Sequence, residues 1–92
     1  MPPLKRTRHF DVDARIRHPE ADHSDWVERV LRAPEETAPD PTSPRRTRHW
    51  GYIEEAAKYM RVVTEPGGAV LTAFFDRNYT RQRQREGRGE EA

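Results

Sequence analysis

The chain has 92 residues, of which 33% are hydrophobic and 36% charged, and its mean hydropathy is −1.17. A chain of this length and composition predicts one domain with a small, concentrated core. No apolar stretch approaches the roughly eighteen residues of a membrane span, and the arginine-rich start lacks the apolar segment of a secretory signal. We therefore expect a cytoplasmic protein with no membrane contact. With no cysteine, and with four histidines that lack close carboxylates at ligand spacing, we expect neither a metal nor a cofactor.

The net charge of +1 hides a segregated distribution. Residues 45–61 carry five basic and two acidic side chains, and residues 77–88 carry five and one. Residues 18–43 instead carry two basic and seven acidic side chains. Basic segments of this kind suit a polyanion, because guanidinium groups pair with phosphates and release counterions. The alternative interpretation is the solvated surface of a chain that uses arginine in place of lysine.

The first half of the chain predicts a short strand over residues 5–12 and then one helix. The helix begins at Ser24 or Asp25, which would cap it, and must end by Ala33 because Pro34 follows. Its apolar side chains fall at the spacing of a single stripe, and they are Trp26, Val27, Val30 and Leu31. A helix of two to three turns needs such a stripe to pack on a sheet, with Trp26 as its largest anchor.

The middle of the chain predicts a loop and then a strand. Residues 35–44 are rich in proline and have no apolar period, so we expect a loop there. Residues 46–53 alternate as a strand, which places two arginines in line with two aromatic side chains on one face, namely Arg46, Arg48, Trp50 and Tyr52. The opposite face would carry Thr47, His49, Gly51 and Ile53. Residues 53–60 also fit a helical period, but a turn over residues 54–58 is favoured because it connects adjacent strands most directly.

The clearest structural signal is a β-hairpin. Two runs of β-branched and aromatic residues, 60–64 and 69–75, flank Glu65-Pro66-Gly67-Gly68. After Tyr79 the chain is charged and almost without apolar side chains. We expect an α+β fold of order β-α-β-β-β, with one domain over residues 1–80. Residues 81–92 would form a flexible, disordered basic tail, although its first part can extend as helix. The predicted shared core contains Trp26, Val30, Leu31, Val62, Val70 or Leu71, and Phe74.

This arrangement resembles a known superfamily. The segments Trp50-Gly-Tyr-Ile, Tyr59-Met-Arg-Val-Val-Thr and Leu71-Thr-Ala-Phe-Phe-Asp-Arg-Asn-Tyr are similar to those of small bacterial nuclease toxins, the group of barnase, EndoU, colicin and RelE-like proteins. The resemblance covers roughly residues 24–79. It implies a metal-free endoribonuclease of toxin type, acting on RNA and neutralised by a cognate antitoxin-like protein. The alternative is a non-enzymatic binding module whose basic sheet face docks nucleic acid or an acidic partner protein.

Cleavage through the 2′-hydroxyl needs a base, an acid and a cation for the phosphorane. His49 is the natural acid or base because its ordinary pKa is near neutrality, and Arg61 is the natural phosphate clamp. Thr72 could bind a phosphate oxygen, and Tyr79 could stack on a base or donate a proton. In the alternative, structural interpretation, Arg61 pairs with a carboxylate such as Asp76, and Tyr79 covers the core.

Whether His49 and Arg61 share a face depends on strand register, which the sequence leaves open. The side chains expected to bind RNA are Arg46, Arg48, Arg61 and Arg77. Of the remaining histidines, His9, His18 and His23, the second is the reserve candidate for an acid or base.

Overall fold

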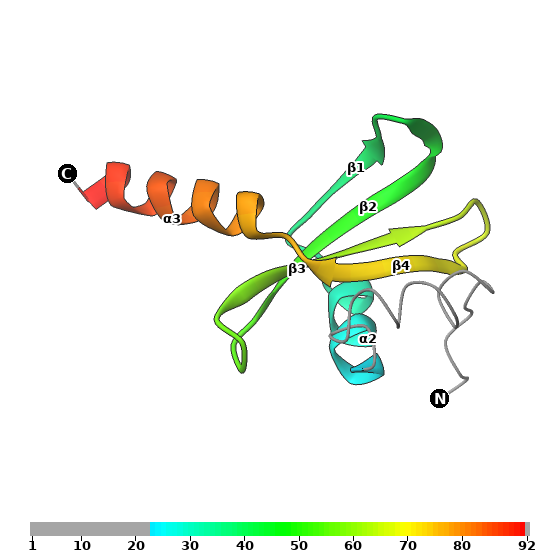
Figure 1. Cartoon of the computed structure of the whole chain (residues 1–92), viewed down its shortest axis with the longest axis horizontal. Helices are drawn as coiled ribbons and strands as arrows, with labels where there is room; N and C mark the ends of the chain where they lie inside the picture. The colour runs from blue at the N-terminus through cyan, green and yellow to red at the C-terminus, as the bar shows by residue number, and fades with distance from the viewer. Residues whose placement is uncertain (1–22, 92) are drawn as a thin grey trace.

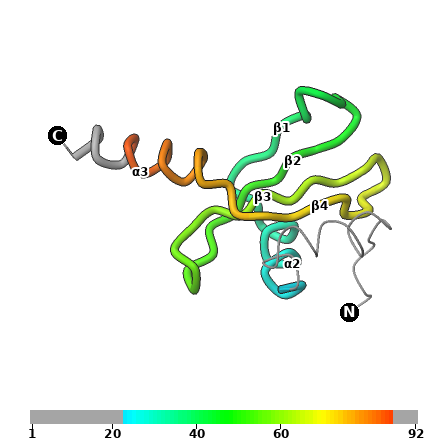
Figure 2. Tube along the Cα trace, viewed as in Figure 1, coloured from blue at the N-terminus to red at the C-terminus, as the bar shows by residue number. Residues whose placement is uncertain are grey.

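The computed structural model describes residues 23–91, with side chains described for residues 23–86. Its elements are α2 (Ser24–Arg32), β1 (Glu36–Asp40), β2 (Ser43–Ile53), β3 (Lys58–Thr64), β4 (Val70–Phe75) and α3 (Arg77–Glu91). The four strands form one antiparallel sheet in the order β1-β2-β3-β4. Figures 1 and 2 show α2 packed beneath this sheet and α3 extending away from it. The α+β class is thus confirmed, whereas the predicted strand over residues 5–12 lies outside the described residues.

The helix α2 covers one face of β2 and β3. Val27 and Val30 are fully buried there, and Gly51 of β2 allows close approach, because a Cβ at Gly51 would lie 3.0 Å from a methyl carbon of Val30. The residue before the helix is His23, which makes no side-chain cap, so the predicted cap at Ser24 or Asp25 was wrong. The predicted end of the helix is confirmed at Arg32.

The core lies between α2 and the sheet and is formed by Val27, Val30, Ile53, Met60, Val62, Val70 and Ala73. Trp26 and Leu31 are only partly buried at its edge, so Trp26 is a weaker anchor than predicted. Phe75 packs against the core, whereas Phe74 pairs with Arg61 on the opposite face. Phe74 was therefore the wrong phenylalanine to expect in the core, because neighbouring strand residues point to opposite faces.

Both predicted reversals are present. Residues 54–57 form a turn rather than a helix, and Gly67 and Gly68 take φ angles of 97° and 95° in the β3–β4 hairpin. The predicted loop over residues 35–44 was wrong, because β1 pairs there with β2. A strand containing Pro39 is tolerated because β1 lies at the sheet edge. At the other end, α3 continues to Glu91, where the sequence predicts a flexible tail.

Candidate nucleic-acid interface

The sheet face opposite α2, which we call the open face, has two arginines near its centre. Register pairs Trp50 of β2 with Arg61 of β3, and Arg48 with Val63, so the two arginines are diagonal neighbours. Side chains at diagonal positions of adjacent strands start about 7–8 Å apart, within reach of one shared ligand. The open face is therefore the part of the sheet on which basic side chains converge.

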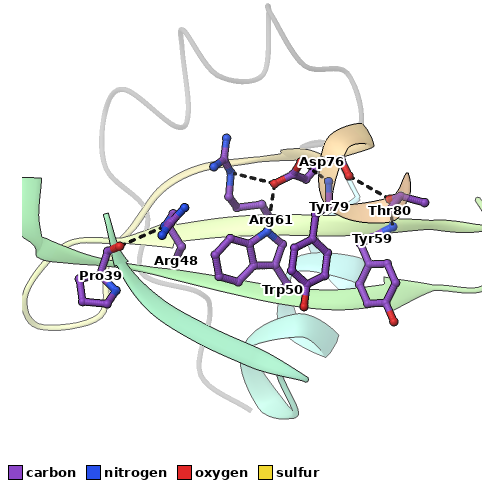
Figure 3. A network of polar contacts seen from close by, with 8 residues as sticks. All are labelled: Pro39, Arg48, Trp50, Tyr59, Arg61, Asp76, Tyr79 and Thr80. Carbon is purple, nitrogen blue, oxygen red and sulfur yellow. Dashed lines mark hydrogen bonds and ion pairs between the residues drawn. The ribbon is translucent and has the colours of Figure 1, made fainter. Parts of the chain in front are cut away.

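Trp50 is the central support of the open face. It is 4% exposed and stacks on Tyr79 with ring centroids 4.9 Å apart and an interplanar angle of 11°. The guanidinium carbon of Arg48 lies 4.8 Å from the indole centroid, and Figure 3 shows Trp50 between Arg48 and Tyr79. Because its ring is covered in this way, Trp50 holds its neighbours in position and offers no free face on which a base could stack.

Asp76 links the sheet to α3. One carboxylate oxygen, Oδ1, accepts the backbone N–H of Tyr79 at 3.0 Å, which caps the helix. The other, Oδ2, accepts the indole N–H of Trp50 at 3.0 Å and lies 3.7 Å from Nε of Arg61 (Figure 3). Thr80 adds a further link, since its hydroxyl donates to the carbonyl of Asp76 and accepts the N–H of Tyr59. This network fixes the first turn of α3 against β2 and β3.

The two arginines are held by their inner nitrogens. Nε of Arg48 donates to the carbonyl of Pro39 at 3.1 Å, while Nε of Arg61 is buried and has only the ion pair with Asp76. The guanidinium of Arg61 also lies 4.4 Å from the ring centroid of Phe74. Among residues 23–86, the terminal Nη atoms of Arg48 and Arg61 make no hydrogen bond. These atoms are the ones that bind a phosphate bidentately.

The helix α3 adds a second set of polar groups. The hydroxyl of Tyr79 donates to the carboxylate of Glu36 at 2.6 Å, so α3 is tied to the edge strand β1. Burial, and then this bond to Glu36, raise the pKa of Tyr79 well above its ordinary value, so the phenol is protonated at neutral pH. Arg83, one turn further along α3, lies over the ring of Tyr59 at 5.9 Å.

Two cavities flank the arginine pair. The first, of about 420 Å³, lies between the sheet and α3 and is lined by Glu36, Trp50, Asp76, Tyr79 and Arg83 among others. The second, of about 350 Å³, lies towards the β1–β2 turn and is lined by Thr42, Val63, Leu71, Thr72 and Phe74 among others. Arg48 and Arg61 line both cavities. The open face thus offers two hollows with cationic groups between them.

The structure brings some of the predicted site residues together. Arg48 and Arg61 lie between the cavities, Tyr79 lines the first and Thr72 lines the second. Arg46 is engaged elsewhere, because its Nε lies 3.4 Å from the carboxylate of Glu65. Arg77 is exposed and lines a separate small pocket with Lys58 and Arg81.

His49 does not lie with Arg61. It pairs with Val62 in register and points to the side of the sheet that α2 covers, whereas Arg61 pairs with Trp50 on the open face. A ring nitrogen of His49 lies 3.0 Å from the hydroxyl of Thr64, and burial lowers the pKa of the imidazole. A single RNA phosphate on the open face cannot contact both His49 and Arg61. The structure therefore does not bring together the predicted acid or base, His49, and the predicted phosphate clamp, Arg61.

Several residues of the interface were missed in the sequence. Asp76 was expected only as a carboxylate partner of Arg61, but it directly precedes the helix that begins at Arg77, and an aspartate at that place is a common cap, so its capping role was detectable. Glu36 was assigned to a loop and therefore not considered. Arg83 was assigned to a tail. Of the remaining histidines, only His23 is described, and it stacks on Trp26 with centroids 3.6 Å apart, away from the open face.

Searches of the described residues for metal clusters and membrane spans, and of known proteins for similar chains, gave no match. Within the described part of the chain, no cluster of three histidine, aspartate or glutamate side chains could hold a metal ion, and no helix is long and apolar enough to cross a membrane. In comparisons with known proteins, no family model, no curated protein and no solved structure matches this chain.

Proposed function

We propose that the protein binds single-stranded RNA on the open face of its sheet, with Arg48 and Arg61 as the phosphate contacts. The observation that supports this most directly is the state of these two side chains. Each guanidinium lies over an aromatic ring and is held at Nε, by a hydrogen bond in Arg48 and by an ion pair in Arg61, while its Nη atoms make no hydrogen bond among residues 23–86. An arginine fixed in this way loses little further entropy when it binds a phosphate.

The distribution of charge around the arginines indicates where the phosphate lies. The first cavity balances Arg48, Arg61 and Arg83 against three acidic side chains, Glu36, Asp76 and Glu86. The second cavity sets Arg48 and Arg61 against Asp40 alone, and that carboxylate already accepts two hydrogen bonds from Thr42. A phosphate is therefore favoured in contact with Arg48 and Arg61 and disfavoured deep in the first cavity, where three carboxylates would repel it.

A single strand suits the face better than a duplex. The bases of a single strand are exposed, and they can stack on planar guanidinium groups or on aromatic rings such as that of Tyr52, which is 42% exposed at the end of β2. The hydroxyls of Thr42 and Thr72 line the second cavity and can hydrogen-bond a 2′-hydroxyl, which favours RNA over DNA.

The test is fluorescence anisotropy with a labelled RNA strand of about twelve nucleotides. Arg48→Gln and Arg61→Gln should each weaken binding about tenfold or more, because each removes charge-assisted bonds to phosphate. Arg81→Gln is the matched control, since it removes the same charge from a part of α3 outside both cavities. Equal losses in all three variants would contradict a specific face, and tighter binding of the same sequence as DNA would contradict the preference for RNA.

Cleavage at the RNA phosphate held on the arginine pair is the second candidate function, favoured by Glu36 and Tyr79, which line the first cavity together with Arg48 and Arg61. The 2′-oxygen would bond to phosphorus while the bond from phosphorus to the 5′-oxygen breaks, leaving a 2′,3′-cyclic phosphate and a 5′-hydroxyl. Glu36 would accept the 2′-hydroxyl proton and Tyr79 would protonate the 5′-oxygen. The 2.6 Å bond between them then returns the proton from Glu36 to Tyr79, so both recover their starting state.

Cleavage on this route should be slow, because the raised pKa of Tyr79 makes it a weak acid. The assay follows the cyclic phosphate product in the presence of a chelator. Tyr79→Phe should abolish the product while keeping the stack on Trp50, and His49→Gln should leave it unchanged. Loss of product in His49→Gln with Tyr79→Phe still active would contradict this route. No product from the parent protein would leave RNA binding alone.

A further inference from the structure

The two cavities of the open face share Arg48 and Arg61 and no other residue. Their volumes, about 420 and 350 Å³, both fall in the range of about 300–1,000 Å³ found for small-molecule sites. Two cavities with a pair of cations between them match the chemistry of two nucleosides joined by one phosphate. Each cavity would take one nucleoside, and the arginines would take the phosphate.

The cavities differ in what they can recognise. The first presents a carboxylate and two side-chain amides, from Glu36, Asn78 and Gln82, which can bind the polar edge of a base. The second is walled by Val63, Leu71 and Phe74, with threonine hydroxyls at its margin. Apolar walls contact the face of any base or ribose but do not distinguish one base edge from another.

We propose that the open face binds two successive nucleotides. The phosphate that joins them lies on Arg48 and Arg61, the nucleotide in the first cavity is selected by its base, and the nucleotide in the second is accepted whatever its base. This inference rests on the proposed binding of RNA, which it deepens by naming the smallest ligand and the selective position.

The measurement is competition against the labelled RNA strand by all dinucleoside monophosphates and by single nucleoside monophosphates. Dinucleotides should compete about tenfold better than single nucleotides, because only they occupy both cavities and the arginine pair. Base identity at one position should change the inhibition constant about tenfold, the discrimination of one good hydrogen-bonded pair. Identity at the other position should change it less than about threefold.

Two variants assign the cavities. Gln82→Ala, at an exposed position of α3, should flatten the base preference and leave the non-selective position unchanged. Leu71→Gln should weaken all dinucleotides by a similar factor and leave the preference intact. Thermal melting checks that both variants are folded, and Gln84→Ala, outside both cavities, is the control for Gln82→Ala.

The outcomes separate this inference from the function on which it rests. Binding of the long strand together with equal competition by single nucleotides and dinucleotides would overturn the two-nucleotide site and keep RNA binding. A base preference that survives Gln82→Ala but is lost in Leu71→Gln would reverse the assignment of the cavities and refute the proposal as stated. Failure of the long strand to bind would overturn both.

Discussion

Removing the carboxylate of Asp76 should destabilise the protein, because this side chain contacts β2, β3 and α3. In Asp76→Ala, the N–H of Tyr79 loses its cap, which costs about 1 kcal/mol. The indole N–H of Trp50, in a side chain only 4% exposed, loses its acceptor, which costs about 1–3 kcal/mol. The ion pair with Arg61 is longer, at 3.7 Å, and adds at most about 1 kcal/mol.

The sum is about 2–5 kcal/mol in the free energy of unfolding, read from urea denaturation followed by tryptophan fluorescence. For a domain of this size each kcal/mol corresponds to about 4–8 °C in Tm. Asp76→Asn should lie between parent and alanine variant, because an amide has one acceptor oxygen for the two bonds that Asp76 accepts. Glu54→Ala, at an exposed turn position, is the control and should change stability by less than about 0.5 kcal/mol. An effect of Asp76→Ala no larger than that control would refute the network.

Three further predictions concern the α2 side of the sheet. The bond to Arg29 lowers the pKa of Glu55 from 4.5 to about 2, so its stabilising effect should be complete above pH 4.5 and lost as the pH falls towards 2. Acid titration of unfolding should show a flatter slope in that window for Glu55→Gln, and an unchanged slope would contradict the ion pair. Burial lowers the pKa of His49 below 6.5, so the parent should lose stability as the pH falls below 6.5, and His49→Gln should remove that loss. Gly51→Ala should cost about 1–3 kcal/mol in urea denaturation, because its Cβ would press on Val30, and a neutral result would argue against close approach of α2.

The elements that the sequence predicts correctly are those with strong local signals. The hairpin around Gly67 and Gly68 is predictable from its turn residues and the two apolar runs that flank them. The end of α2 is predictable from Pro34. The strand β1 has neither signal. Its residues pair because β2 offers a strand edge with free backbone groups. The carbonyl of Pro39 also accepts a hydrogen bond from the Nε–H of Arg48. Stabilisation that comes from the partner strand cannot be predicted from the sequence of β1 alone.

The candidate site depends on register, which local sequence does not specify. Alternation correctly placed Arg48 and Trp50 on one face of β2 and His49 on the other, but the pairing of β2 with β3 decided that Arg61 lies with the first pair and not with His49. The register shift beside Thr64 is a second non-local feature of the β3–β4 pair. The alternative interpretation, in which Arg61 pairs with Asp76, agrees with the ion pair at 3.7 Å, while the role of Arg61 as a phosphate clamp stays a prediction. The activity on RNA and the antitoxin-like partner stay predictions.

The salt dependence of RNA binding shows whether Arg48 and Arg61 contact phosphate. Each phosphate contact on a single strand adds about 0.7 to the slope of log affinity against log salt. If Arg48 and Arg61 are such contacts, the slope should fall by about 0.7 in Arg48→Gln or Arg61→Gln and by about 1.4 in the double variant, while Arg81→Gln keeps the parent slope. A double variant with the parent slope, or a parent protein whose affinity does not change with salt, would contradict phosphate binding by this arginine pair.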